Sequence, residues 1–201
     1  ATVEHRLENG TALRNNTRVG GYRKFYQNVF PGAVSAAGTS VSISAYSHGT
    51  ERDNLFNQTD VVIPFTTGPV THEVLAGLEF ARQETANLRL TGYFTTVSPT
   101  TTSVSVPVSN PRTTLPLTFL PSATDADNFG VAKSAAVYVQ DQVTLLPQLH
   151  AIAGLRLERF EIDFRHRRTG AMVGNRDDLV SPRAGLIYKP LRQLSVYTSY
   201  S

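Results

Sequence analysis

The side chains that could carry out catalysis do not form a recognisable site. No two of the five histidines have metal-ligand spacing on one strand face, and ordinary strand or loop positions explain them. They are His5, His48, His72, His150 and His166. Gly20-Gly21 lacks the Lys and the helix of a phosphate loop, there is no Gly-x-Ser-x-Gly motif, and there is no cysteine. The sequence therefore assigns no catalytic residue, no metal site, no cofactor and no enzymatic activity.

A basic cluster is the first candidate for ligand binding. It consists of Arg165, His166, Arg167 and Arg168. Cations gathered where a strand meets a loop raise the local concentration and the association rate of an anion. A solvated loop whose charges meet Asp177 and Asp178 across a hairpin explains the same cluster, so both interpretations stay open.

A second candidate lies where a predicted strand passes into the longest loop. Arg89, Tyr93 and Phe94 stand at this junction. An arginine can donate hydrogen bonds to ligand oxygens, and an aromatic face can stack on a planar ring. Loop aromatics that only cover the rim of a sheet are the alternative interpretation.

Composition limits the class of protein that presents these residues. Of the 201 residues, 40% are hydrophobic and 17% are charged, which is too apolar for a disordered chain. No run of about 18 apolar residues could form a transmembrane helix. The net charge of +3 comes from scattered residues rather than from the clusters that nucleic-acid binding requires.

Alternation of apolar and polar residues predicts an all-β chain. From Ala151 to Leu157, for example, Ala153 and Leu155 face one way and Arg156 faces the other. About eight antiparallel strands are predicted, at residues 1–7, 11–27, 41–65, 71–84, 130–145, 149–165, 179–188 and 194–201.

The predicted connections alternate between short and long. Asn9-Gly10 and Gly68-Pro69 mark tight turns, whereas residues 28–40, 85–129 and 166–178 have the composition of long loops. All short turns then lie at one end of the sheet and all long loops at the other. Outer-membrane β-barrels have this arrangement, with an apolar outer face and a polar lumen. We therefore predict an up-and-down transmembrane β-barrel segment in which residues 85–129 form a long extracellular loop.

The strand predicted at 149–165 changes its pattern beyond Arg159. Its apolar residues move to the other face, as Phe160, Ile162 and Phe164. Either a β-bulge lies near Arg159 or the strand has left the lipid there, and we favour the second interpretation.

The order of several sequence segments is the most specific signal. The last third contains AVYVQDQ, GLRLERFEIDFRHRRTG, DDLVSPRAGLIYKP and LSVYTSYS between residues 136 and 201. LRNNTR at 13–18 and NQTDVVIPFTTGPVTHEVLAGLEF at 57–80 precede them. Together these segments resemble the barrel of TonB-dependent outer-membrane receptors, particularly those for ferric siderophores of the catecholate type. The resemblance covers nearly all predicted strands and little of 85–129.

The resemblance implies an internal fragment of a plugged barrel of about 22 strands in the outer membrane of a Gram-negative bacterium. The plug domain and the signal peptide would be absent from this chain. The whole receptor would bind a ferric siderophore at the two candidate groups and import it with energy from the TonB complex. Iron would enter only as the chelate. Four arginines on the polar face would line the lumen and contact the plug rather than the ligand: Arg14, Arg18, Arg156 and Arg183.

Two other functions stay open. A complete eight-stranded outer-membrane barrel that serves as an adhesin or anchor has the right number of strands. The missing leader, the missing terminal aromatic residue and the family segments disfavour it. A soluble all-β binding module would bury its apolar faces internally, and it would stay monodisperse without detergent.

Overall fold

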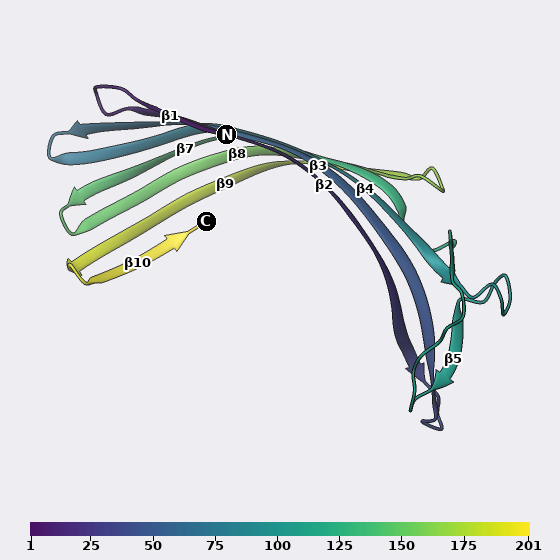
Figure 1. Ribbon diagram of the computed structural model, residues 1–201. Helices are drawn as coiled ribbons and strands as arrows, with labels where there is room; N and C mark the ends of the chain where they lie inside the picture. The colour runs from purple at the N-terminus through teal and green to yellow at the C-terminus, as the bar shows by residue number, and fades with distance from the viewer.

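The computed structural model describes residues 1–201 as one curved antiparallel sheet (Figure 1). Its strands are β1 (Thr2–Arg6), β2 (Ala12–Val34), β3 (Ser40–Thr67), β4 (Val70–Tyr93), β5 (Ser103–Pro107), β6 (Thr118–Leu120), β7 (Asp127–Leu146), β8 (Leu149–His166), β9 (Met172–Leu191) and β10 (Leu194–Tyr200). The main path is β1-β2-β3-β4-β7-β8-β9-β10, and β5 and β6 pair with the ends of β3 and β4. The predicted all-β, up-and-down architecture is confirmed. No helix of the chain is long and apolar enough to span a bilayer.

The sheet is open. β1 and β10 lie at its two edges and do not pair with each other. The alternative of a closed eight-stranded barrel is therefore wrong for this chain, because closure would require those two strands to share a ladder.

Tight turns lie where the sequence predicts them. Gly10, between β1 and β2, has a φ of 84°, and Gly68, between β3 and β4, has a φ of 60°. Only glycine adopts this left-handed conformation without a steric penalty. These turns lie at the end of the sheet on the left of Figure 1.

The opposite end differs from the prediction. β2 continues to Val34 and β3 begins at Ser40, while β8 ends at His166 and β9 begins at Met172. Most of 28–40 and 166–178 is therefore strand, and the long connection is 94–126, which itself contains β5 and β6. Polar residues can remain in a strand here because a sheet that is solvated on both faces needs no apolar alternation.

The strands keep one register through the middle of the sheet, so each side chain has a defined face. Asp60, Gly77, Tyr138 and Arg156 are aligned across β3, β4, β7 and β8. We call the face with these residues the inner face. The outer face carries the alternating positions, including Leu155, and it is apolar at this height.

The apolar band of the outer face ends near Arg159. The pairing of β8 with β7 and β9 runs through this residue without a shift, which excludes the β-bulge. The outer face instead becomes charged: Arg159 Nε lies 2.7 Å from Asp178 Oδ1, and Arg176 Nε lies 2.7 Å from Glu161 Oε1. Paired charges at this level fit a strand that has passed out of the lipid.

A small buried core lies under the 94–126 connection. It consists of Val41, Ile43, Phe94 and Val106. By the alternation along β3, Val41 and Ile43 belong to the outer face. The connection thus folds over the outer side of the strand ends, and the inner side chains of this region stay only partly buried.

Candidate functional site

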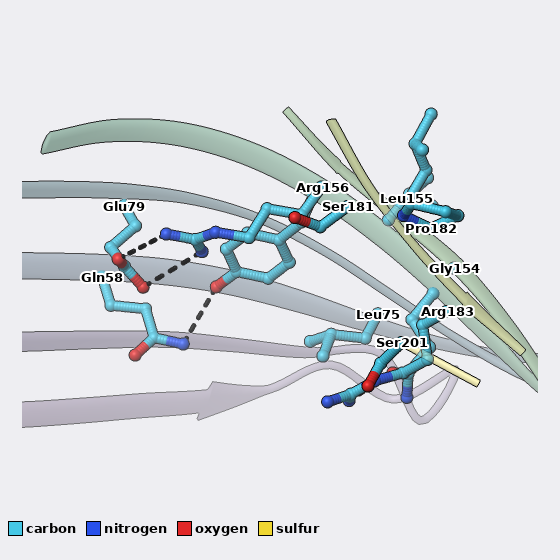
Figure 2. Close-up of a pocket in the computed structure, with 13 residues that line it drawn as sticks. Gln58, Leu75, Glu79, Gly154, Leu155, Arg156, Ser181, Pro182, Arg183 and Ser201 are labelled. Carbon is cyan, nitrogen blue, oxygen red and sulfur yellow. Dashed lines mark hydrogen bonds and ion pairs between the residues drawn. The ribbon is translucent and has the colours of Figure 1, made fainter. Parts of the chain in front are cut away.

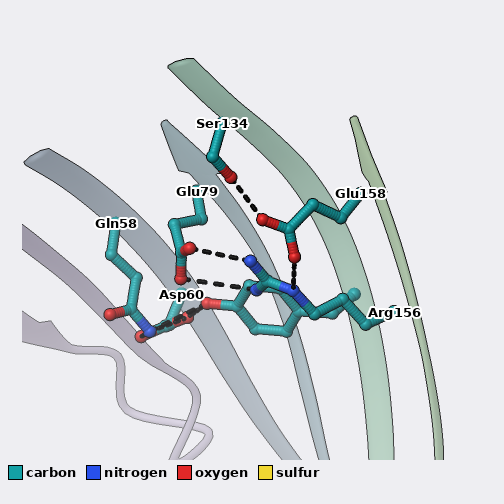
Figure 3. A network of polar contacts seen from close by, with 7 residues as sticks. Gln58, Asp60, Glu79, Ser134, Arg156 and Glu158 are labelled. Atoms are coloured by element: carbon teal, nitrogen blue, oxygen red, sulfur yellow. Dashed lines mark hydrogen bonds and ion pairs between the residues drawn. The ribbon is translucent and has the colours of Figure 1, made fainter. Parts of the chain in front are cut away.

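A polar network occupies the inner face at mid-height of the sheet (Figure 3). We call it the midwall network; it consists of Gln58, Asp60, Glu79, Ser134, Tyr138, Arg156 and Glu158. Arg156 is its centre. Its Nη2 and Nη1 donate to the two oxygens of Glu79 at 2.7 and 3.3 Å, and its Nε donates to Glu158 Oε2 at 2.9 Å. The fork of two bonds to Glu79 fixes the guanidinium in one orientation.

Tyr138 joins the network from β7. Its hydroxyl donates to Asp60 Oδ1 and accepts a hydrogen bond from Gln58 Nε2 at 2.9 Å. The ring lies over Gly77 on the neighbouring strand, where an added Cβ would stand 2.5 Å from the Tyr138 Cζ. Glycine at position 77 therefore makes room for the ring, and the ring covers backbone that a glycine leaves bare.

A hollow of about 330 Å³ opens beside the network. Figure 2 shows Arg156 extending toward Glu79 at one end, where Gln58 also lies, with Leu75 and Arg183 toward the other end. The midwall network contains three carboxylates and a single guanidinium, and the Arg156, Glu79 and Glu158 side chains are 21–28% exposed. This surface offers hydrogen-bond acceptors to a polar or cationic partner.

The inner face changes character along β2, β3 and β4 toward the far end of the sheet. Aromatic and cationic residues alternate there; they are Tyr22, Lys24, Tyr26, Phe30, Tyr46, His48, Arg52 and Arg89. We call this surface the apical wall. Tyr46 has its ring centroid 5.8 Å from that of Tyr26 and 5.7 Å from that of Phe30, both edge to face.

Three cations of the apical wall lie over aromatic rings. The Arg89 Cζ is 4.3 Å from the centroid of Tyr46, and the Lys24 Nζ is 5.0 Å from that of Tyr26. The third pair is Arg52 over Tyr22 at 5.6 Å. Cation–π contact holds the charges against the wall while leaving most of their hydrogen-bond donors free.

The strands of the apical wall carry no carboxylate on their inner face. Every inner position of β2, β3 and β4 from Gly20, Phe56 and Ala81 to the strand ends is neutral or basic. A hydrogen bond from Tyr26, with the side chain of Asn28 and the nearby cations, lowers the pKa of Tyr46 below its usual value. The wall is thus suited to a ligand that is both anionic and aromatic.

A family model described as TonB dependent receptor-like, beta-barrel matches residues 1–201. The chain belongs to this family. The resemblance seen in the sequence is thereby confirmed, and the open sheet is a partial segment of such a barrel.

Individual receptors show the same likeness. The probable TonB-dependent siderophore receptor PiuA of Acinetobacter baumannii is 25% identical over 167 residues, which cover 76% of this chain and 22% of PiuA. The crystal structure of PiuA superposes with a TM-score of 0.77 at 23% identity, covering 98% of this chain and 30% of that one. The open form of the ferric-catecholate import receptor Fiu of E. coli K12 gives 0.77 at 20% identity, covering 99% and 34%. The chain therefore spans about a third of the solved receptors it matches.

The three candidate residues at the end of β4 lie in different surroundings. Arg89 belongs to the apical wall. Tyr93 lies four residues farther along the same face, where it pairs with Thr118 of β6. The Arg89 guanidinium does not lie over the Tyr93 ring but over the ring of Tyr46 on β3. Phe94 is 0% exposed in the small core. We withdraw Phe94 as a ligand-stacking residue, because its ring has no free face.

The basic cluster is dispersed by the hairpin of β8 and β9. Arg165 pairs with Met172 on the outer face, Arg167 lies 5.6 Å over the Phe129 ring, and Arg168 Nη1 donates to the Ser122 carbonyl. None of them forms an ion pair with Asp177 or Asp178, since the strand register brings Arg159 to Asp178. Arg168 thereby attaches the end of the 94–126 connection to this hairpin, whereas Arg167 lies against β7.

All four arginines assigned to the lumen lie on the inner face. Arg14 Nε is 3.1 Å from Glu4, Arg183 Nη1 donates to Gln140 at 3.3 Å, and Arg18 is exposed. Arg156 differs from them because two carboxylates already engage it.

The sequence analysis missed the aromatic members of the apical wall. Tyr22, Lys24 and Tyr26 stand at alternate positions, as do Tyr46 and His48. This same-face spacing is a signal that the sequence contains. The residues between these positions are not uniformly apolar, so the segment does not show the alternation of an amphipathic strand.

Proposed function

We propose that this chain is part of an outer-membrane receptor that binds a ferric siderophore, of the catecholate type, and imports it with energy from the TonB complex. Membership of the TonB-dependent receptor family supports the receptor class. The likeness to PiuA, a probable siderophore receptor, supports a siderophore, and the likeness to Fiu, a ferric-catecholate import receptor, supports a catecholate. The receptor has no resident cofactor in this proposal, because iron arrives and leaves as the chelate.

The apical wall is the ligand-binding surface in this proposal. The observation that carries the assignment is the Arg89 guanidinium, held 4.3 Å over Tyr46 on strands whose inner positions at this level carry no carboxylate. A ferric catecholate is an anion whose ligand rings are flat and aromatic. Cationic donors would meet its oxygens and tyrosine rings would meet its ring faces.

The midwall network serves the plug rather than the ligand in this proposal. Its excess of carboxylates would repel an anionic chelate but would accept hydrogen bonds from a plug in the lumen. Arg14, Arg18 and Arg183 would contact the same plug. The TonB complex would act on a part of the receptor outside this chain.

Ligand binding to the full-length receptor tests the proposal. Arg89→Ala is expected to weaken equilibrium binding of ferric 2,3-dihydroxybenzoate about tenfold, the scale of a lost charged hydrogen bond. Tyr46→Ala removes both a stacking face and the support of Arg89, and it is expected to weaken binding as well. Arg82→Ala is the matched control, since Arg82 lies on the outer face of the same strand. Unchanged affinity in both wall variants would exclude the apical wall, and failure of the wild type to bind any ferric siderophore would exclude the function.

A further inference from the structure

The carboxylate of Asp125 is buried beside Arg89, at the edge of the apical wall. It is 3% exposed, although it stands in the connection just before β7. Its Oδ2 accepts hydrogen bonds from the backbone N–H groups of Thr91 and Ser122 at 2.9 and 2.8 Å, and the Thr91 hydroxyl donates to its Oδ1 at 2.9 Å. These donors satisfy the hydrogen-bonding capacity of a carboxylate that is shielded from water.

The same carboxylate faces Arg89. Arg89 Nε lies 3.6 Å from Asp125 Oδ1, which is an ion pair longer than a hydrogen bond. The backbone is fixed too, since the Arg89 N–H donates to the Ala126 carbonyl at 2.7 Å. Tyr46 lies under the guanidinium and Asp125 stands at its Nε edge, so the two Nη groups are left for an external acceptor.

A chain of contacts extends from Asp125 to the next hairpin. Ser122, which donates its N–H to Asp125, accepts a hydrogen bond at its carbonyl from Arg168 Nη1. The 94–126 connection therefore has a fixed end at the point where it meets Arg89. Local strand geometry alone would leave the long Arg89 side chain free to choose among several rotamers.

We infer that Asp125 is the positioning residue of the apical wall: it holds Arg89 over Tyr46 with the Nη edge turned outward. Asp125 itself does not touch the ligand. The binding test of this inference rests on the proposed function. Asp125 belongs to the 94–126 connection, so the connection and not only the strands would determine the geometry of the apical wall.

Asp125→Asn separates the contact with Arg89 from the hydrogen bonds by which Asp125 holds the backbone of the connection. An asparagine whose Oδ1 takes the place of the present Oδ2 keeps both backbone hydrogen bonds, whereas the ion pair to Arg89 is lost. Asp127→Asn makes the same charge change two residues away on the outer face, and it is the control for net charge. In the full-length receptor in 0.5 M salt, where long-range attraction is screened, Asp125→Asn is expected to weaken binding of ferric 2,3-dihydroxybenzoate roughly threefold to tenfold relative to Asp127→Asn.

A double-mutant cycle decides whether the effect passes through Arg89. In an Arg89→Ala background the difference between the two Asn variants is expected to vanish. An equal difference in both backgrounds, or none in either, overturns the inference. If Arg89→Ala alone does not change affinity, the inference fails, whereas the wall assignment fails only if Tyr46→Ala does not change affinity either.

Crystal structures of the ligand-free variants give a readout that needs no binding. Arg89 is expected to keep its place about 4.3 Å from the Tyr46 ring in Asp127→Asn and to leave the ring in Asp125→Asn. Arg89 still seated on Tyr46 in Asp125→Asn would overturn the inference, even if no siderophore were ever found to bind.

Discussion

The midwall network and the apical wall lie on one face of the same strands, yet they use arginine in opposite ways. Arg156 donates its side-chain hydrogen bonds to Glu79 and Glu158, so its charge is balanced within the sheet. Arg89 lies on a tyrosine ring and is 3.6 Å from a single carboxylate, which leaves donors available. The carboxylate neighbours thus distinguish an arginine whose donors are used within the sheet from an arginine whose donors remain available.

The contrast between the two arginines matters only if the inner face lines the lumen. Leu155→Arg tests this assignment of the faces and has the largest expected effect. Leu155 is on the outer face directly before Arg156. Arginine on the lipid face costs about 2–4 kcal/mol near the middle of the bilayer, so the amount of assembled receptor in isolated outer membranes is expected to fall sharply. Arg183→Gln on the inner face is the control and is expected to leave that amount unchanged. The reverse result would place both arginine sites outside the lumen.

Arg156→Met tests whether the midwall network is structural. It leaves Glu79 and Glu158, which flank the guanidinium from β4 and β8, without a cation, and we expect a loss of roughly 1–3 kcal/mol, less than for a fully buried pair because these groups are partly exposed. Urea unfolding of the receptor in detergent measures this change. A fully stable variant with impaired ligand binding would reverse the roles of the two regions.

Gly77→Ala tests the packing on which the network rests. The added methyl group would clash with the Tyr138 ring and the Asp60 carboxylate, both 2.5 Å away, and overpacking of this kind costs about 1–2 kcal/mol. Gly20→Ala is the matched control, because nothing lies within 4 Å of its added Cβ. Equal unfolding midpoints for the two variants would show that Tyr138 moves aside freely.

Lys24→Gln probes the field of the apical wall and has the smallest expected effect. Lys24 lies over Tyr26 and carries no ion pair. Its loss is expected to slow association of a ferric catecholate by less than about threefold at low salt, and the difference should disappear at high salt because screening removes steering. Stopped-flow association rates measure it. A change in the dissociation rate instead would give Lys24 a direct contact with the ligand.

The sequence by itself determined the elements and their faces. Strict alternation around Leu155 and Arg156 separates an apolar face from a polar face, because successive side chains of a strand point to opposite sides. Gly10 and Gly68 mark turns, because only glycine fits the left-handed backbone there. The order of the strand segments was specific enough to indicate the family that the comparison shows.

The tertiary structure decided which residues meet. Arg156 and Glu79 are 77 positions apart, and Tyr138 and Asp60 are 78 apart. Such pairs depend on the register between strands, which a slip of one residue would change completely. The same holds for Arg89, whose neighbours Tyr46 and Asp125 come from a different strand and from the far end of the long connection. Residues 28–40 and 166–178 also needed the structure: beyond the lipid, a strand and a loop have the same polar composition, and only backbone pairing with a neighbour distinguishes them.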